Sequence, residues 1–174
     1  MKASILKKSL ISMIDSKIPV FVWGNPGVGK SSIIKQIAND KNMEFIDLRL
    51  SLLDPTDLRG IPFFDSANKS AIWAKPEFLP NSNSQAFGIL FLDEINSAPP
   101  TVQAAAYQLI LDRKIGEYTL PMNYAIVAAG NYESDRGVTY RMPTPLANRF
   151  VHLDFELDFE EWKSWAYESK IDTR

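Results

Sequence analysis

The 174-residue chain contains no cysteine and only one histidine. The absence of cysteine excludes disulfides, thiol catalysis and thiolate metal sites, and the lone histidine argues against a metal centre built from imidazoles. No stretch approaches the roughly 20 consecutive apolar residues of a membrane helix, and the N-terminal residues lack the apolar core of a signal peptide. We therefore expect no membrane segment and a cytoplasmic location.

Neither sign of charge is in excess. Nineteen Lys and Arg stand against 21 Asp and Glu, which gives a formal net charge of −2, so the chain as a whole does not attract DNA, RNA or anionic lipid. No direct nucleic-acid binding is indicated. The chain does have 45% hydrophobic residues, which is enough to build the core of one compact α/β domain, whereas a second full domain would not fit.

Five segments have the composition of β-strands. Three are almost continuously apolar, as is typical of strands buried on both faces: 19–23, 88–92 and 124–129. Apolar and polar residues alternate in 45–50 and 150–155, which favours edge positions. Because helical patterns separate these strands, the sequence predicts a three-layer α/β/α sandwich with a central, mostly parallel five-stranded sheet.

Two other patterns concern the connections. Within the polar segment 51–85, Ile61–Phe64 and Ala71–Trp73 can pair as a hairpin, and an irregular surface loop is the alternative. Near the C-terminus, Asp158 followed by Glu161 resembles a capping box, which indicates that a last amphipathic helix begins there and runs to the end of the chain.

A glycine-rich segment of the P-loop pattern lies directly after the first predicted strand and before a helix. Its glycines allow the backbone N–H groups to point inward at phosphates, and the helix N-terminus adds partial positive charge. We expect Lys30 to reach the β- and γ-phosphates of a nucleotide and Ser31 to ligate Mg²⁺ through its hydroxyl; a simple glycine-rich helix cap is the alternative. The expected nucleotide contacts are Gly24, Asn25, Pro26, Gly27, Val28, Gly29, Lys30, Ser31 and Ser32.

Two carboxylates, Asp93 and Glu94, end the third predicted strand. Acidic groups at the end of a buried strand are costly unless a cation or a proton-transfer task awaits them. We expect Asp93 to hold the Mg²⁺ through a water, and Glu94 to act as the general base for the attacking water. A helix-capping acidic pair is the alternative.

Asn131 ends the fourth predicted strand, and its amide is suited to orienting the attacking water if that strand lies between the other two central ones. A turn-forming asparagine is the alternative. Phosphoryl transfer also needs a further cation, and an arginine finger contributes about 10³ to 10⁵ in rate. Arg149, just before the last predicted edge strand, is the leading candidate and should face a neighbouring subunit. Arg141 is the second; either one could equally be an ordinary surface arginine.

Taken together, these motifs resemble the MoxR branch of the AAA+ ring ATPases. The glycine-rich loop and three further segments occur in family order: Leu92–Asn96, Asn131 and Asn148–Phe150. Asp54–Gly60 and the hairpin after it resemble the insert in the second helix of this branch. Lys114–Pro121 resembles the hairpin that precedes the strand carrying the sensor asparagine.

The resemblance implies a sheet order of 5-1-4-3-2, which agrees with the central and edge positions inferred above. It also implies ATP hydrolysis with Mg²⁺ in a hexameric ring, an arginine finger that acts on the neighbouring subunit, and remodelling or activation of a client protein, often with a von Willebrand A-domain partner. The family's helical lid would follow the core, so we expect residues 1–174 to form the nucleotide-binding core without that lid.

Two other functions stay open. A nucleotide-gated binding module that hydrolyses little would use the same motifs. A small-molecule kinase is the rival enzyme, although it would not account for Glu94 and Asn131 together. A GTPase is disfavoured because the nearest match to an Asn-Lys-x-Asp guanine-reading motif, Asn68–Ala71, lacks the aspartate.

Overall fold

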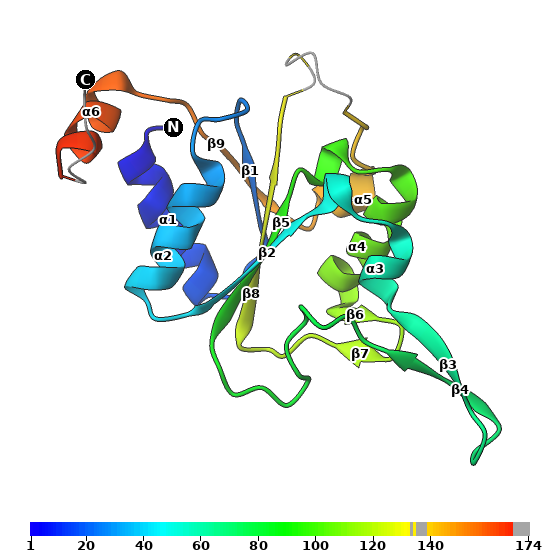
Figure 1. Cartoon of the computed structure of the whole chain (residues 1–174). Helices are drawn as coiled ribbons and strands as arrows, with labels where there is room; N and C mark the ends of the chain where they lie inside the picture. Colours follow the sequence, from blue (N-terminus) through cyan, green and yellow to red (C-terminus); the bar gives the residue numbers. More distant parts are fainter. Residues whose placement is uncertain (133, 135–138, 169–174) are drawn as a thin grey trace.

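The computed structural model describes residues 1–132, 134 and 139–168, which form three layers (Figure 1). The middle layer is a sheet in which every neighbouring pair of strands is parallel. Its spatial order is β2 (Glu44–Arg49), β5 (Gly88–Asp93), β8 (Tyr124–Gly130), β1 (Val20–Trp23) and β9 (Val151–Asp154). This arrangement confirms the predicted α/β class.

The labels differ from the predicted order 5-1-4-3-2 only because four hairpin strands are numbered among them along the chain. The neighbours are the same, with β2 and β9 at the edges. Residues of β8 are buried throughout, as are those of β5 up to Leu92. In contrast, β2 alternates between buried and accessible positions, and in β9 only Leu153 is buried. The apolar and alternating patterns of the sequence therefore placed the central and edge strands correctly.

Helices cover both faces of the sheet (Figure 1). On one face lie α1 (Ala3–Asp15) and α2 (Lys30–Asp40), whose buried aliphatic side chains pack with those of β1, β5 and β8. On the other face lie α3 (Pro55–Arg59), α4 (Pro100–Asp112) and α5 (Thr144–Ala147), together with the short 3-10 helices η1 (Leu50–Leu52) and η2 (Ile95–Ser97). The sheet thus separates two apolar cores.

Two antiparallel hairpins interrupt the alternation of strands and helices. The first, β3 (Ile61–Asp65) with β4 (Ser70–Ala74), projects from the body of the domain (Figure 1). The second pairs β6 (Lys114–Ile115) with β7 (Tyr118–Thr119) next to α4. Both hairpins were predicted, and the loop alternative for the first one is wrong.

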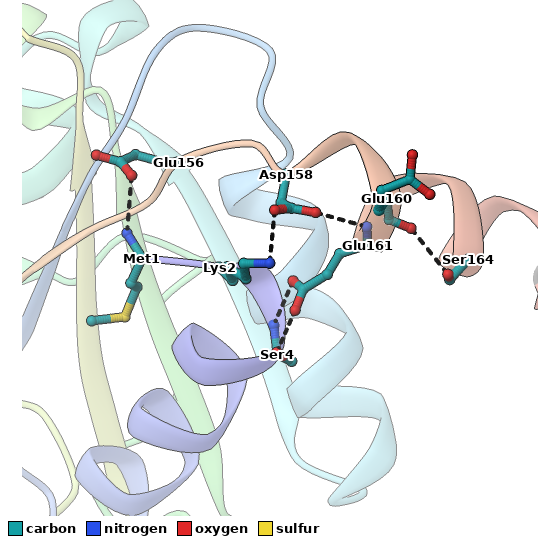
Figure 2. Close-up of polar contacts among 8 residues, drawn as sticks. All are labelled: Met1, Lys2, Ser4, Glu156, Asp158, Glu160, Glu161 and Ser164. Carbon is teal, nitrogen blue, oxygen red and sulfur yellow. Dashed lines mark hydrogen bonds and ion pairs between the residues drawn. The ribbon is translucent and has the colours of Figure 1, made fainter.

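The last described helix, α6 (Phe159–Glu168), is held against the start of α1 by polar contacts (Figure 2). Asp158 Oδ1 accepts the N–H of Glu161 at 3.0 Å, and Lys2 Nζ lies 2.9 Å from Asp158 Oδ2. The Glu161 carboxylate does not return to Asp158, as a complete capping box would require; it accepts the Ser4 hydroxyl at 2.6 Å. Only half of the predicted box forms, because a partner on α1 engages the second acid. The remainder of the predicted helix, 169–174, lies outside the described residues.

Every described helix is too short or too polar to span a lipid bilayer.

Candidate active site

The glycine-rich segment leaves β1 at Trp23 and enters α2 at Lys30. Gly27 and Gly29 have φ angles of 78° and 94°, a left-handed conformation that glycine adopts without the penalty of a side chain. No heavy atom lies within 4 Å of where a Cβ would stand on either residue, so the backbone angle, and not crowding, requires glycine. Gly29 is the N-cap of α2 and supplies no capping side chain, which leaves the first N–H groups of the helix to a ligand or water.

Lys30 lies under this turn with only 8% of its surface exposed. Its Nζ donates to the carbonyl oxygens of Gly24 at 2.7 Å and Asn25 at 3.0 Å, and to Asn131 Oδ1 at 2.9 Å. The bond to Asn131 joins the start of α2 to the end of β8, and β8 is the neighbour of β1 in the sheet. The structure therefore brings two of the predicted site residues into direct contact.

The backbone of Asn131 is hydrogen-bonded to Asn96, a residue to which the sequence analysis assigned no role. Asn96 in η2 is 3% exposed, and its side-chain amide donates to the Asn131 carbonyl at 2.7 Å while its Oδ1 accepts the Asn131 N–H at 3.2 Å. This two-way contact fixes the backbone from which the Asn131 side chain extends. The burial of Asn96 depends on the packing of η2 against β8, which no local sequence pattern reveals.

Asp93 and Glu94 lie at the end of β5, next to β8 in the sheet. Burial raises the pKa of Asp93 above its ordinary value, and the N–H of Glu94, which Asp93 Oδ1 accepts at 2.9 Å, opposes this shift only in part. The nearby Glu94 charge raises the Asp93 pKa further. The Asp93 carboxylate is thus in a place where a cation would stabilise its charged form.

Glu94 has a φ of 55°, an unusual conformation for a residue with a side chain. Its carboxylate accepts a short hydrogen bond from the Ser51 hydroxyl, and Arg49 Nε lies 3.8 Å from its other oxygen. The sequence analysis missed both partners. Arg49 is paired in register with Asp93 across the β2–β5 ladder, so only the sheet register, which no local pattern reveals, places Arg49 and Ser51 beside Glu94.

The remaining predicted residues lie around this centre. Ser31 is half-buried and Ser32 exposed in the first turn of α2. Arg149 is exposed in the turn between α5 and β9, and Arg141 is exposed ahead of α5. Among residues 1–132, 134 and 139–168, neither arginine side chain makes a hydrogen bond or ion pair, so both guanidinium groups are available to another molecule.

These features define a nucleotide-binding domain of the P-loop class. The sheet is parallel, and a glycine-rich turn with a buried lysine beneath it follows one strand. An acidic pair lies at the end of a nearby strand. Comparison with known proteins agrees with this class. The model of the family described as "ATPase family associated with various cellular activities (AAA)" matches residues 19–152. The chain therefore belongs to this AAA family, and its site is of the ATPase type.

Curated proteins of similar sequence indicate a branch of this family. The chain is 28% identical over 152 residues to Chaperone MoxR1 of Mycobacterium tuberculosis (strain ATCC 25618 / H37Rv), a match that covers 84% of this chain and 38% of that protein. It is 30% identical over 107 residues to the replication factor C large subunit of Ignicoccus hospitalis, covering 62% of this chain and 20% of that protein. The family match and the similarity to Chaperone MoxR1 together confirm the predicted resemblance to the MoxR branch, although the chain spans well under half the length of either relative.

Solved structures share the fold. A crystal structure of a candidate ATPase from Cytophaga hutchinsonii ATCC 33406 superposes with a TM-score of 0.67 at 22% identity, covering 98% of this chain and 51% of that one. NtrX from Brucella abortus gives a TM-score of 0.59 at 16% identity, covering 99% and 43%. At these identities the similarity supports the architecture alone.

Proposed function

We propose that this chain binds Mg·ATP at the turn between Gly24 and Ser32 and hydrolyses it as the nucleotide-binding core of a ring-forming ATPase. The observation that carries the proposal is the hydrogen bond from Lys30 to Asn131, with Asp93 and Glu94 at the end of the adjacent strand β5. Phosphate-binding, water-orienting and acidic groups thus converge at the carboxyl ends of neighbouring parallel strands, where ligands of open α/β sheets bind.

The residues present suit a triphosphate with its magnesium. The turn offers open space at Gly27 and Gly29 and uncapped N–H groups at the start of α2. Burial raises the pKa of Asp93, so a nearby cation would stabilise the charged form of its carboxylate. Ser31 and Asp93 are the residues that would hold Mg²⁺, and the bound metal would neutralise charge on the phosphates.

Each protein group then has a defined task. Lys30 holds the terminal phosphates, Glu94 accepts a proton from the attacking water, and Asn131 orients that water through its amide. The Arg149 guanidinium is exposed and makes no hydrogen bond or ion pair within the described part of the chain, which suits a residue that acts on the nucleotide of a neighbouring subunit; Arg141 is the second candidate.

The ring, the client and the location are the wider part of the proposal. Membership of the AAA family and the similarity to proteins named as a chaperone and as a replication factor subunit support assembly into an oligomer, here a hexameric ring. We propose that the ring remodels or activates a client protein in the cytoplasm, with a von Willebrand A-domain protein as a candidate partner.

One observation favours a second function, a nucleotide-gated binding module with little hydrolysis. The Glu94 carboxylate is already engaged by Ser51 and lies near Arg49. A general base held in this way would not reach a water until it is released. Under this alternative the chain binds Mg·ATP and assembles, but turnover stays slow unless a partner frees Glu94.

Turnover measured against protein concentration tests the proposal. We expect specific activity to rise as subunits assemble, because Arg149 completes the site of a neighbour, and we expect Arg149→Ala to abolish the rise. Glu94→Gln should keep Mg·ATP binding near normal and stop hydrolysis, while Glu117→Gln, an exposed acid in the β6–β7 turn, serves as the matched control. Unchanged turnover in Glu94→Gln would reject the base assignment, and concentration-independent turnover would favour a monomeric kinase.

A further inference from the structure

The only histidine of the chain connects the strand that leads into the glycine-rich turn to the turn that carries Arg149. His152 lies on the edge strand β9. Its Nδ1 accepts the indole N–H of Trp23 at 2.8 Å, and its Nε2 lies 2.8 Å from the Ala147 carbonyl oxygen. An indole nitrogen can only donate, so Nδ1 must be the acceptor and Nε2–H the donor. The two contacts therefore select one neutral tautomer.

At one end of this link is the turn 147–150. The Ala147 carbonyl also accepts the N–H of Phe150 at 3.3 Å, and the Leu146 carbonyl accepts the N–H of Arg149 at 2.9 Å. Arg149 is thus a central residue of a tight turn whose first carbonyl is held by His152. The turn is also anchored by Leu146 and Phe150, which are buried in the core, and Phe150 lies edge-on to Phe21 at 5.6 Å between centroids. The contact with His152 adds a side-chain hydrogen bond at the Ala147 carbonyl, between these two anchors.

At the other end is Trp23, the residue immediately before Gly24. The Trp23 ring stacks on His152, with centroids 6.0 Å apart and an interplanar angle of 18°, and on Tyr132, with centroids 6.1 Å apart. Phe21 also lies against the imidazole, at 5.6 Å between centroids. These ring contacts hold the imidazole plane in the orientation that both hydrogen bonds need.

We infer that His152 is a positioning residue that sets the Arg149 turn relative to the subunit's own nucleotide loop, through the chain Trp23–His152–Ala147. The inference rests on the proposed function of Arg149 as a finger for the neighbouring subunit. As a consequence, the orientation of Arg149 in each subunit depends on Trp23 of β1, the strand that leads into the glycine-rich turn of the same subunit. The described contacts of His152 are with Trp23, Ala147 and neighbouring aromatic rings, so we assign it no direct part in the reaction.

A double-mutant cycle in ATP turnover tests the inference. His152→Phe keeps a ring for stacking but lacks both hydrogen bonds, and we expect it to lower kcat by about three- to tenfold, the effect of one or two weakened bonds on the finger. Binding of Mg·ATP to the subunit should change by less than about twofold. In an Arg149→Ala background the same substitution should cost nothing more, because the group on which it acts is gone.

Two further variants separate positioning from folding. His152→Gln retains an N–H near the place of Nε2 and should recover most of the activity. Trp23→Phe keeps a smaller aromatic ring and removes the donor to Nδ1 while the bond from His152 to Ala147 stays. It should therefore show a smaller loss of the same kind, and it tests the link even if His152→Phe fails to fold. Equal melting temperatures for wild type and His152→Gln establish that activity is compared between folded proteins.

The results distinguish the two levels of the argument. Equal losses from His152→Phe with and without Arg149, or no loss in any of these variants, would overturn the positioning role and leave the finger assignment intact. If Arg149→Ala alone leaves kcat unchanged, the finger assignment fails and the inference built on it fails too.

Discussion

Replacement of Lys30 by methionine tests the phosphate site most directly. Methionine has similar length and volume but lacks the ammonium group, whose donors now serve the carbonyls of Gly24 and Asn25 and the amide of Asn131. A hydrogen bond from a cation to a charged phosphate contributes about 1.5 to 3 kcal/mol. Its loss should raise the Kd for Mg·ATP by about 10- to 100-fold.

The expected signal is a ligand-induced change in melting temperature. At a nucleotide concentration 100 times the wild-type Kd, binding adds about 2.7 kcal/mol to the stability. For a domain of this size each kcal/mol corresponds to about 2–4 °C, so Tm should rise by about 5–11 °C. If the substitution raises Kd 100-fold, the same nucleotide concentration adds only about 0.4 kcal/mol, or about 1–2 °C.

Differential scanning calorimetry with and without Mg·ATP measures both quantities. Lys8→Met is the matched control, because Lys8 is exposed on α1 and makes no described polar contact; it should keep the full wild-type shift. The melting temperature without nucleotide shows whether each variant folds. A Lys30→Met protein that folds and still gains the full shift would refute the assignment of this turn as the nucleotide site.

The remaining predictions concern Glu94 and the attachment of α6. Ser51→Ala removes the donor to Glu94. If this hydrogen bond keeps the Glu94 carboxylate away from the attacking water, kcat should rise by about fivefold, equivalent to about 1 kcal/mol, with nucleotide affinity unchanged. A fall in kcat would mean that Ser51 holds Glu94 in its catalytic position. Asp158→Asn preserves the helix cap but removes the ion pair with Lys2, so proteolysis between β9 and α6 should quicken at neutral pH, while Glu160→Gln should have no effect. Hydrogen bonds from Lys2 and Ser4 hold the pKa values of Asp158 and Glu161 below their ordinary values, so this attachment should be intact at neutral pH and weaken as the pH falls below about 4.

Local patterns were sufficient for the architecture of this domain. The alternation of apolar and polar residues in β2 and β9 identified the edge strands, because each has one face open to solvent, and continuous apolar runs identified β5 and β8. The glycine-rich turn was equally readable, since its function depends on backbone conformation at a few adjacent positions.

Contacts between distant strand ends were not readable from the sequence. Asn96 meets Asn131 across 35 positions, and Ser51 meets Glu94 across 43. Each contact depends on which strands are neighbours and on their register, and a shift of register by one residue would turn the side chains to the opposite face. The half-formed capping box at α6 was also unreadable, because Glu161 bonds to Ser4 on α1, 157 positions away, and only the packing of these two helices brings them together.

The contacts of Lys30 also indicate how a bound nucleotide would change the hydrogen bonding of Asn131. The present partners of the ammonium are two neutral carbonyls and one neutral amide oxygen, and bonds from a cation to neutral acceptors are weaker than bonds to phosphate oxygens. A bound triphosphate would therefore draw Lys30 away from at least one of them. Asn131 Oδ1 would then be free to accept from the attacking water, while Asn96 still fixes the Asn131 backbone. Under the proposed function, Asn131 would therefore become available to orient the water only after the phosphates have bound.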